Sequence, residues 1–75
     1  MHVISVTHAQ WEVILQIWNS CYELIWRFVD EDAARELDEA GLISIWEEPF
    51  EDEYWWSAIL SQEVVESILA WESSE

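Results

Sequence analysis

The sequence predicts a mainly helical α+β domain with one long central helix, a short second helix, an acidic-tipped β-hairpin and a C-terminal helix. Three observations support this fold class: a helical period over residues 11–29, a short charged segment that ends at Gly41, and two β-branched or aromatic segments on either side of Pro49. With 75 residues, the chain is expected to form a single domain over residues 1–75. An all-α bundle is the alternative fold class.

The central helix is expected over residues 11–29. Thr7 and Gln10 match a capping box just before it. Thirteen of its nineteen residues are apolar, and at about 100° per residue the polar ones fall within one arc of roughly 100°. Such a helix would be about 28 Å long and buried on most of its circumference. Residues 1–6 are apolar and β-branched, and we expect an edge strand or a packed arm there.

A short second helix is expected over residues 33–40. Residues 30–32 are acidic and suit the positive end of its dipole, and Gly41 stands where a helix-ending glycine belongs. Leu37 and Ala40, with one of the two preceding alanines, are expected to face inward.

Both arginines have an acidic residue four positions before them, in the order that favours helical ion pairs. The expected pairs are Glu23–Arg27 and Glu31–Arg35. Because these are the only basic side chains apart from two histidines, no basic patch remains. This argues against direct binding of nucleic acid by the chain.

The hairpin is expected to consist of strands Leu42–Trp46 and Tyr54–Leu60, joined by the acidic connection Glu47–Glu53 that Pro49 interrupts. A helical reading of residues 42–60 remains open, because several apolar residues also fit a period of 3.6.

The C-terminal helix is expected to begin after Ser61 as N-cap and to cover Gln62–Glu72. Glu63, Glu66 and Ser67 should face solvent. The residues expected on its buried side are Val64, Val65, Ile68, Leu69 and Trp71.

The charge balance is extreme: seventeen carboxylates, two arginines and no lysine give a formal net charge of −15. Self-repulsion among these charges opposes a compact state, so they invite a functional interpretation. Fifteen charges match about 25 Å of duplex DNA at one charge per roughly 1.7 Å, and a compact chain of this length is on the order of 30 Å across. Mimicry of a nucleic acid is therefore physically reasonable. Solubility, adaptation to high salt and a basic partner that binds no nucleic acid would each also account for the acidity.

The candidate partner-binding residues are carboxylates in three clusters and two adjacent tryptophans. Helical carboxylates three or four residues apart lie ~5–6 Å from each other, near the spacing of successive phosphates. Adjacent tryptophans on a strand point to opposite faces, so one is expected as an aromatic anchor within a charged rim. The candidates are Asp30, Glu31, Asp32, Glu36, Asp38, Glu39, Glu47, Glu48, Glu51, Asp52, Glu53, Trp55 and Trp56. The remaining tryptophans on helices, Trp11, Trp18, Trp26 and Trp71, are expected in the core.

No catalytic, metal or cofactor site is expected. His2 and His8 have no partner pattern, and His8 should face solvent in the first turn of its helix. Cys21 has no second cysteine and is expected to be a small buried hydrophobe in a cytoplasmic protein. Charged residues within residues 11–29 argue against a membrane span, whereas the surplus apolar surface leaves a homodimer open beside a monomer.

The segment Ala33–Ile43 (AARELDEAGLI) resembles the part of winged-helix domains where a helix ends in glycine and enters the wing. The resemblance extends over about residues 31–61. It implies a surface that in this chain carries acids where a DNA-reading wing carries basic residues.

In size, charge and lack of catalytic groups the whole chain resembles small phage-type DNA-mimic inhibitors of the anti-CRISPR and anti-restriction class. This resemblance implies a non-catalytic inhibitor that occupies the basic DNA- or RNA-binding groove of a nucleic-acid-processing protein or CRISPR-type complex. The alternative is an acidic antitoxin or adaptor that neutralises a basic protein through exposed Trp side chains and carboxylates.

Overall fold

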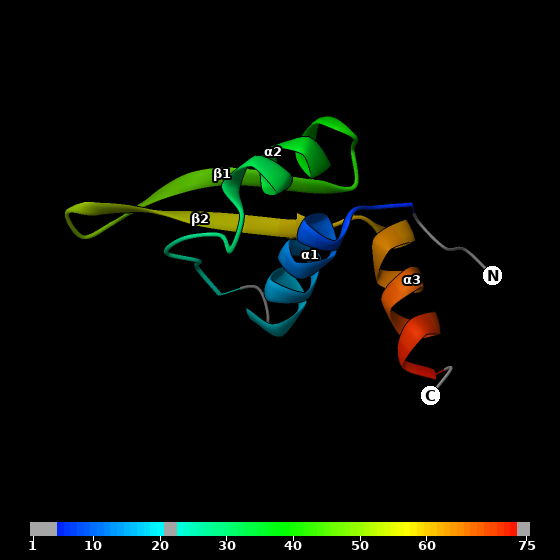
Figure 1. Ribbon diagram of the computed structural model, residues 1–75. Coiled ribbons are helices and arrows are strands. Elements are labelled where there is room, and N and C mark those ends of the chain that lie inside the picture. Colours follow the sequence, from blue (N-terminus) through cyan, green and yellow to red (C-terminus); the bar gives the residue numbers. More distant parts are fainter. Residues whose placement is uncertain (1–4, 21–22, 74–75) are drawn as a thin grey trace.

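The fold, described by a computed structural model for residues 5–20 and 23–73, is α+β and mainly helical, as the sequence predicts. The molecule is elongated, with extents of 43 × 21 × 18 Å, because a hairpin projects away from the helices (Figure 1). The elements in chain order are α1 (His8–Ser20), α2 (Glu31–Glu39), β1 (Ile43–Phe50), β2 (Glu53–Leu60) and α3 (Gln62–Ser73).

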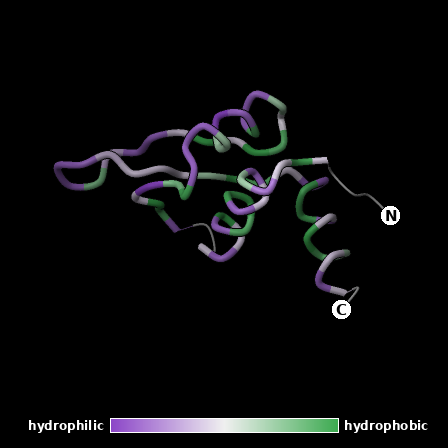
Figure 2. The backbone as a smooth tube through the Cα atoms, in the orientation of Figure 1, coloured by the Kyte–Doolittle hydropathy of each residue, from purple (hydrophilic) through white to green (hydrophobic). Residues whose placement is uncertain are grey.

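The core lies where α1 and α2 pack on one face of the hairpin, near the end of the hairpin that joins α2 and α3. We call this the inner face. The hydropathy map shows green stretches on α1 and α3, interrupted by purple, whereas the hairpin turn and much of α2 are purple (Figure 2). The buried core residues are Val13, Ile14, Ile17, Ile25, Phe28, Ala33, Ala34, Leu37, Ile43, Ala58, Leu60, Val64 and Ile68.

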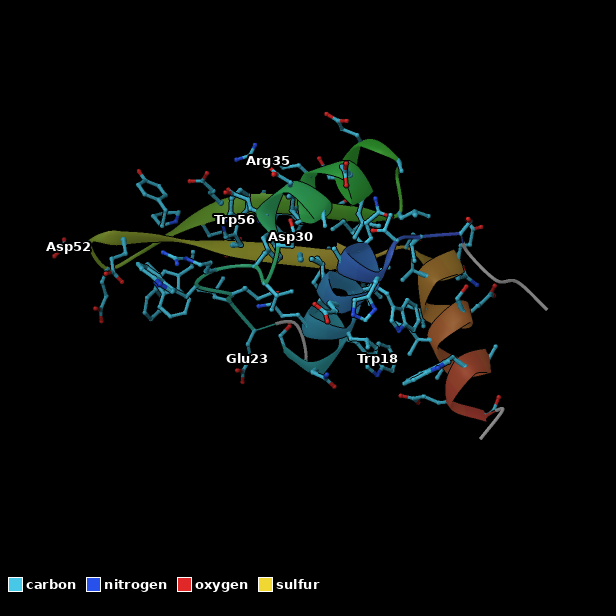
Figure 3. All side chains as sticks on the ribbon, viewed as in Figure 1. Trp18, Glu23, Asp30, Arg35, Asp52 and Trp56 are labelled. Atoms are coloured by element: carbon cyan, nitrogen blue, oxygen red, sulfur yellow. The ribbon has the colours of Figure 1, made fainter. Side chains whose placement is uncertain are left out.

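The predicted hairpin is confirmed, and the alternative helix over residues 42–60 does not form. Strands β1 and β2 pair antiparallel from Ile43↔Leu60 to Phe50↔Glu53, so only two residues, Glu51 and Asp52, form the turn. Asp52 lies at the free end of the molecule (Figure 3). The predicted seven-residue acidic connection is therefore wrong in length, since Glu47 to Phe50 belong to β1. Pro49 is tolerated within β1 because this strand has β2 on one side only.

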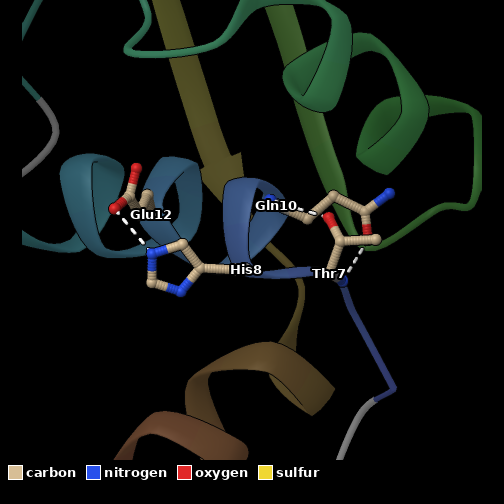
Figure 4. A network of polar contacts seen from close by, with 4 residues as sticks. All are labelled: Thr7, His8, Gln10 and Glu12. Atoms are coloured by element: carbon tan, nitrogen blue, oxygen red, sulfur yellow. Dashed lines mark hydrogen bonds and ion pairs between the residues drawn. The ribbon is translucent and has the colours of Figure 1, made fainter.

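The predicted capping box is confirmed at the start of α1. The Thr7 backbone N–H donates to Gln10 Oε1 at 3.0 Å, and the Gln10 N–H donates to Thr7 Oγ1 at 3.1 Å (Figure 4). His8 is exposed, as expected, and its Nε2 lies 3.0 Å from Glu12 Oε1. These local contacts fix the first turn, so the helix begins at His8 rather than at Trp11.

The predicted long helix over residues 11–29 is wrong in extent, because α1 ends at Ser20. The chain then returns beside the hairpin, where Ile25 exchanges two backbone hydrogen bonds with Trp56, at 2.8 and 2.7 Å. The helical pair Glu23–Arg27 consequently does not form among the described residues. Because the chain returns, Ile25 and Phe28 enter the core. A straight helix would have carried these two residues past the core.

Gln16 of α1 holds the returning segment in place. Its Nε2 donates to the Arg27 carbonyl and its Oε1 accepts from the Val29 N–H, both at 2.9 Å. Gln16 belongs to the polar arc that the helical reading placed in solvent. Its amide instead pairs with backbone groups of the returning segment.

Helix α2 begins at Glu31, two residues before the expected start, and ends at Glu39, just before the helix-ending glycine as expected. Asp30 is the N-cap, and its Oδ1 accepts from the Ala33 N–H at 3.0 Å. At the other end Gly41 has a φ of +77°, and the Leu42 N–H donates to the Leu37 carbonyl at 3.0 Å, which closes a Schellman motif. The buried side of the helix is Ala33, Ala34 and Leu37, whereas Ala40, expected to face inward, is exposed.

Helix α3 begins after Ser61, whose Oγ accepts from the Val64 N–H at 3.4 Å. Its buried side is narrower than predicted and is rotated. Ser67 is buried and donates to the Glu63 carbonyl at 3.0 Å, whereas Leu69 and Trp71 are about half exposed. The expected core positions of Leu69 and Trp71, and the expected solvent exposure of Ser67, are therefore wrong.

The other tryptophans expected in the core differ in how far they are buried. Trp11 and Trp18 are partly buried against the core, and Trp11 makes an edge contact with Trp71 at 5.8 Å between ring centroids. Trp26 is 51% exposed, so its expected burial is wrong. It follows Ile25 in the returning segment and faces away from the core.

Some expectations fall outside the described residues: those for His2 and Cys21, and residues 1–4 of the N-terminal arm. Of the expected edge strand, Ser5 and Val6 are described and are not in a strand. Val6 is partly buried against the core, as expected of a packed arm.

Candidate partner-binding surface

The carboxylates between residues 30 and 53 dominate the surface of the second helix and the hairpin. Eleven of the seventeen acidic residues lie in this stretch, with Arg35 as its only basic residue. Nine of the eleven are exposed, and Asp30 and Glu48 are partly buried. This stretch therefore carries the highest density of carboxylates in the chain.

Several carboxylates on α2 also have structural contacts. Glu31 forms an ion pair with Arg35 at 3.0 Å, as predicted. Glu36 accepts from the Gln10 side chain at 3.1 Å, and Asp38 Oδ1 accepts from the Ile45 N–H at 3.4 Å. These contacts tie α2 to α1 and to β1.

Asp32 and Glu39 on α2 are exposed and, within the described part of the chain, make no hydrogen bond or ion pair. Together with Asp30 as the N-cap, they complete the acidic surface of this helix. A partner could therefore engage Asp32 and Glu39 without breaking any intramolecular contact.

The second group of carboxylates lies along the projecting part of the hairpin. Glu47 and Glu48 belong to β1, Glu51 and Asp52 form the turn, and Glu53 begins β2. Glu48 accepts from the Trp46 indole Nε1 at 2.9 Å. The other four are exposed and have no polar side-chain partner among the described residues.

The two acidic groups follow each other along the long axis rather than forming one compact cluster. Asp30 and Arg35 lie over the middle of the molecule and Asp52 at its far end (Figure 3). Fifteen net charges over 43 Å give about one charge per 2.9 Å, compared with roughly 1.7 Å for a duplex and 3.4 Å for one of its strands. The elongated shape therefore lowers the charge density below that expected for a compact chain, towards the density of a single strand.

Trp55 and Trp56 point to opposite faces of the hairpin, as strand geometry predicts. Trp56 is on the inner face, where its ring lies 5.4 Å from that of Phe28 and 5.9 Å from the Arg35 guanidinium carbon. Trp55 is on the opposite face, which we call the outer face. Of the two, only Trp55 lies on a face that the core does not use.

The outer face also carries aromatic side chains that the sequence reasoning missed. Trp55 packs between Trp26, at 5.3 Å, and Phe50, at 5.7 Å between ring centroids. Trp46 lies on the same face of β1 and is 39% exposed. We call Trp26, Trp46, Phe50 and Trp55 the outer aromatic cluster. Alternation along β1 would have placed Trp46 and Phe50 together if the strand had been extended through Pro49.

Comparison with known protein families, curated proteins and solved structures finds no match for this chain. The resemblances to winged-helix domains and to DNA-mimic inhibitors thus stay predictions from sequence. Within residues 5–20 and 23–73, no three His, Cys, Asp or Glu side chains come together in a way that would hold a metal ion. Over the same residues, every helix is too short or too polar to cross a membrane.

Proposed function

We propose that this protein is a non-catalytic inhibitor that occupies the basic DNA- or RNA-binding groove of another protein. The observation that supports the proposal is the exposed acidic surface of residues 30–53, which has one arginine among eleven carboxylates. Arginines and lysines that grip phosphates accept carboxylates with similar charge-assisted hydrogen bonds. Several of these carboxylates have no intramolecular partner to lose on binding.

The partner class follows from the charge and from the compositional resemblance. A nucleic-acid-processing enzyme or a CRISPR-type complex has a groove lined with basic residues, and it would act in the same reducing cytoplasm that we propose for this protein. A charge spacing nearer to one strand than to a duplex favours a groove that grips a single strand, or one strand of a duplex.

The test is competition at a captured partner, with charge-matched variants. One variant neutralises exposed acids of the second helix and hairpin: Asp32→Asn, Glu39→Gln, Glu47→Gln and Asp52→Asn. The control removes the same number of charges elsewhere: Glu23→Gln, Glu63→Gln, Glu66→Gln and Glu72→Gln. We expect the first variant to compete with labelled oligonucleotide more than tenfold less well than the wild type, and the control to stay within about threefold.

Affinity for the partner should also fall steeply as salt rises, because charge pairs at a rim are screened. Equal losses for both variants would show that only total charge matters and would contradict a localised site. Failure of oligonucleotides to displace the protein at all would contradict the mimic itself.

An acidic adaptor or antitoxin is the second candidate function, and the exposed outer aromatic cluster favours it. An aromatic anchor surrounded by charge is typical of protein–protein hot spots. Binding that hardly responds to salt or oligonucleotide, but is lost on Trp55→Ala, would support the adaptor over the mimic.

A further inference from the structure

The outer face of the hairpin is an unpartnered aromatic surface. The core packs against the inner face, and none of the outer aromatic cluster belongs to it. Trp26 is 51% and Phe50 47% exposed, and Ile59 near the base of the same face is half exposed. So much apolar area in so small a protein is a sign of a binding surface.

Carboxylates lie within and beside this aromatic surface. Glu48 is on the same face as Trp46, to whose indole it is hydrogen-bonded, and it is the cross-strand partner of Trp55. Glu53 is opposite Phe50 across the strands. The Trp55 indole Nε1 is buried and makes no hydrogen bond within the described structure. The surface thus offers π faces and negative charge together, whereas the buried Trp55 N–H takes no part in holding an arginine, which has no acceptor.

The same combination already holds an arginine elsewhere in the molecule. On the inner face, Arg35 forms an ion pair with Glu31 at 3.0 Å while its guanidinium carbon lies 5.9 Å from the centre of the Trp56 ring. A carboxylate and an indole face thus share one guanidinium. The outer face repeats these components, Trp55 beside Glu48 and Phe50 beside Glu53, without any arginine of the described chain against them.

We infer that the outer face of the hairpin binds arginine side chains presented by a basic partner protein. This inference rests on the proposed function for the nature of that partner and adds the residue type that it must present. Arginine is favoured over lysine because its planar guanidinium stacks on aromatic rings and pairs with a carboxylate at the same time. A nucleobase is disfavoured as the ligand, because its phosphates would approach an acidic surface. A second copy of the chain would bring fifteen further negative charges.

The experiment titrates the full-length protein with hexaarginine and, separately, with hexalysine at 0.15 M NaCl. Isothermal calorimetry gives the affinities, and the indole N–H signals in ¹H–¹⁵N NMR spectra locate the contacts. We expect hexaarginine to bind about fivefold or more tightly than hexalysine, since the two peptides share a charge but differ in stacking. The largest shifts should belong to the indoles of Trp26, Trp46 and Trp55.

The double variant Trp46→Ala/Phe50→Ala should bring the ratio of the two affinities close to one. Tyr54→Ala is the matched control, because Tyr54 is an exposed aromatic residue of the same hairpin that points to the inner face. It should leave the ratio unchanged. Trp46→Leu/Phe50→Leu, which keeps apolar bulk but removes the π faces, tests the same point if the alanine variant unfolds.

Equal affinities for the two peptides would overturn this inference, and so would an affinity ratio that the double variant leaves unchanged. Neither result would contradict the proposed competition with nucleic acid through charge. A dimer by light scattering, with indole shifts that depend on protein concentration alone, would overturn it in favour of a second copy. If the protein prefers hexaarginine but oligonucleotides fail to displace it from its partner, the proposed function is rejected and this inference stands.

Discussion

The base and the tip of the hairpin belong to the same two strands, yet they are built differently. At the base, Ile43 and Leu60 are buried beneath the helices. At the tip, Phe50 and Tyr54 are exposed, and the turn contains Glu51 with a φ of +59°. Stability therefore comes from the base. The tip, which adds little to the core, is free to carry charge and aromatic surface.

The largest difference is expected from truncating one apolar residue at each end. Leu60→Ala should lower the free energy of unfolding by about 2–5 kcal/mol, because it leaves a cavity at a position that is only 7% exposed. Phe50→Ala should cost less than about 1 kcal/mol, since its side chain is about half exposed and lies outside the core. Urea unfolding followed by far-UV circular dichroism measures both. Similar losses would mean that the tip is part of the cooperative core.

A second difference concerns the caps of the helix that covers the base. Asp30→Ala should cost about 1 kcal/mol, because the Ala33 N–H loses its acceptor. Asp32→Ala, at an exposed position without a capping contact, is the control and should cost ~0.5 kcal/mol or less, from the helix dipole alone. Equal effects in thermal unfolding would show that charge, not capping, accounts for the loss.

The turn at the tip contains a strained position that a substitution can relieve. Glu51→Gly should raise the free energy of unfolding by about 0.5–1 kcal/mol, because a left-handed φ costs a side chain of this type roughly 1–2 kcal/mol. Glu51→Gln removes the same charge and keeps the strained backbone, so it separates the two causes. A gain from Glu51→Gln as large as that from Glu51→Gly would assign the effect to charge repulsion.

The smallest effect expected is electrostatic. Raising NaCl from 10 mM to 0.3 M should increase stability by about 0.5 kcal/mol, because neighbouring like charges repel by a few tenths of a kcal/mol each and salt screens them. The variant Glu47→Gln/Asp52→Asn should lose more of this salt response than Glu63→Gln/Glu72→Gln. A melting temperature that is independent of salt would contradict a concentrated negative tip.

Local signals in the sequence were sufficient for several parts of the fold. The Thr7–Gln10 capping box and the Asp30 N-cap each join groups that are three residues apart in the sequence. Gly41 has the positive φ that a glycine adopts readily at the end of a helix. Exposure of the acidic candidates also follows from charge alone, because unpaired carboxylates are rarely buried. Such features need no knowledge of the tertiary structure.

Other parts depended on contacts distant in sequence. Ile25 and Phe28 fit a helical period, yet their burial comes from pairing with Trp56 in the hairpin, which no local pattern reveals. Trp26 is exposed for the same reason, since it follows Ile25 at a bend in the returning segment, between the buried residues Ile25 and Phe28. The outer aromatic cluster therefore could not be assembled before the returning segment and the strand lengths were known.

The free edge of β1 offers few vacant backbone donors to another strand. Asp38 occupies the Ile45 N–H that faces away from β2, Pro49 has no N–H to offer, and Glu47 adds charge between them. Neighbouring molecules therefore find no run of vacant donors to extend the sheet into fibrils. This edge is thereby a poor template for the addition of a strand, although tryptophans are exposed on the adjoining outer face.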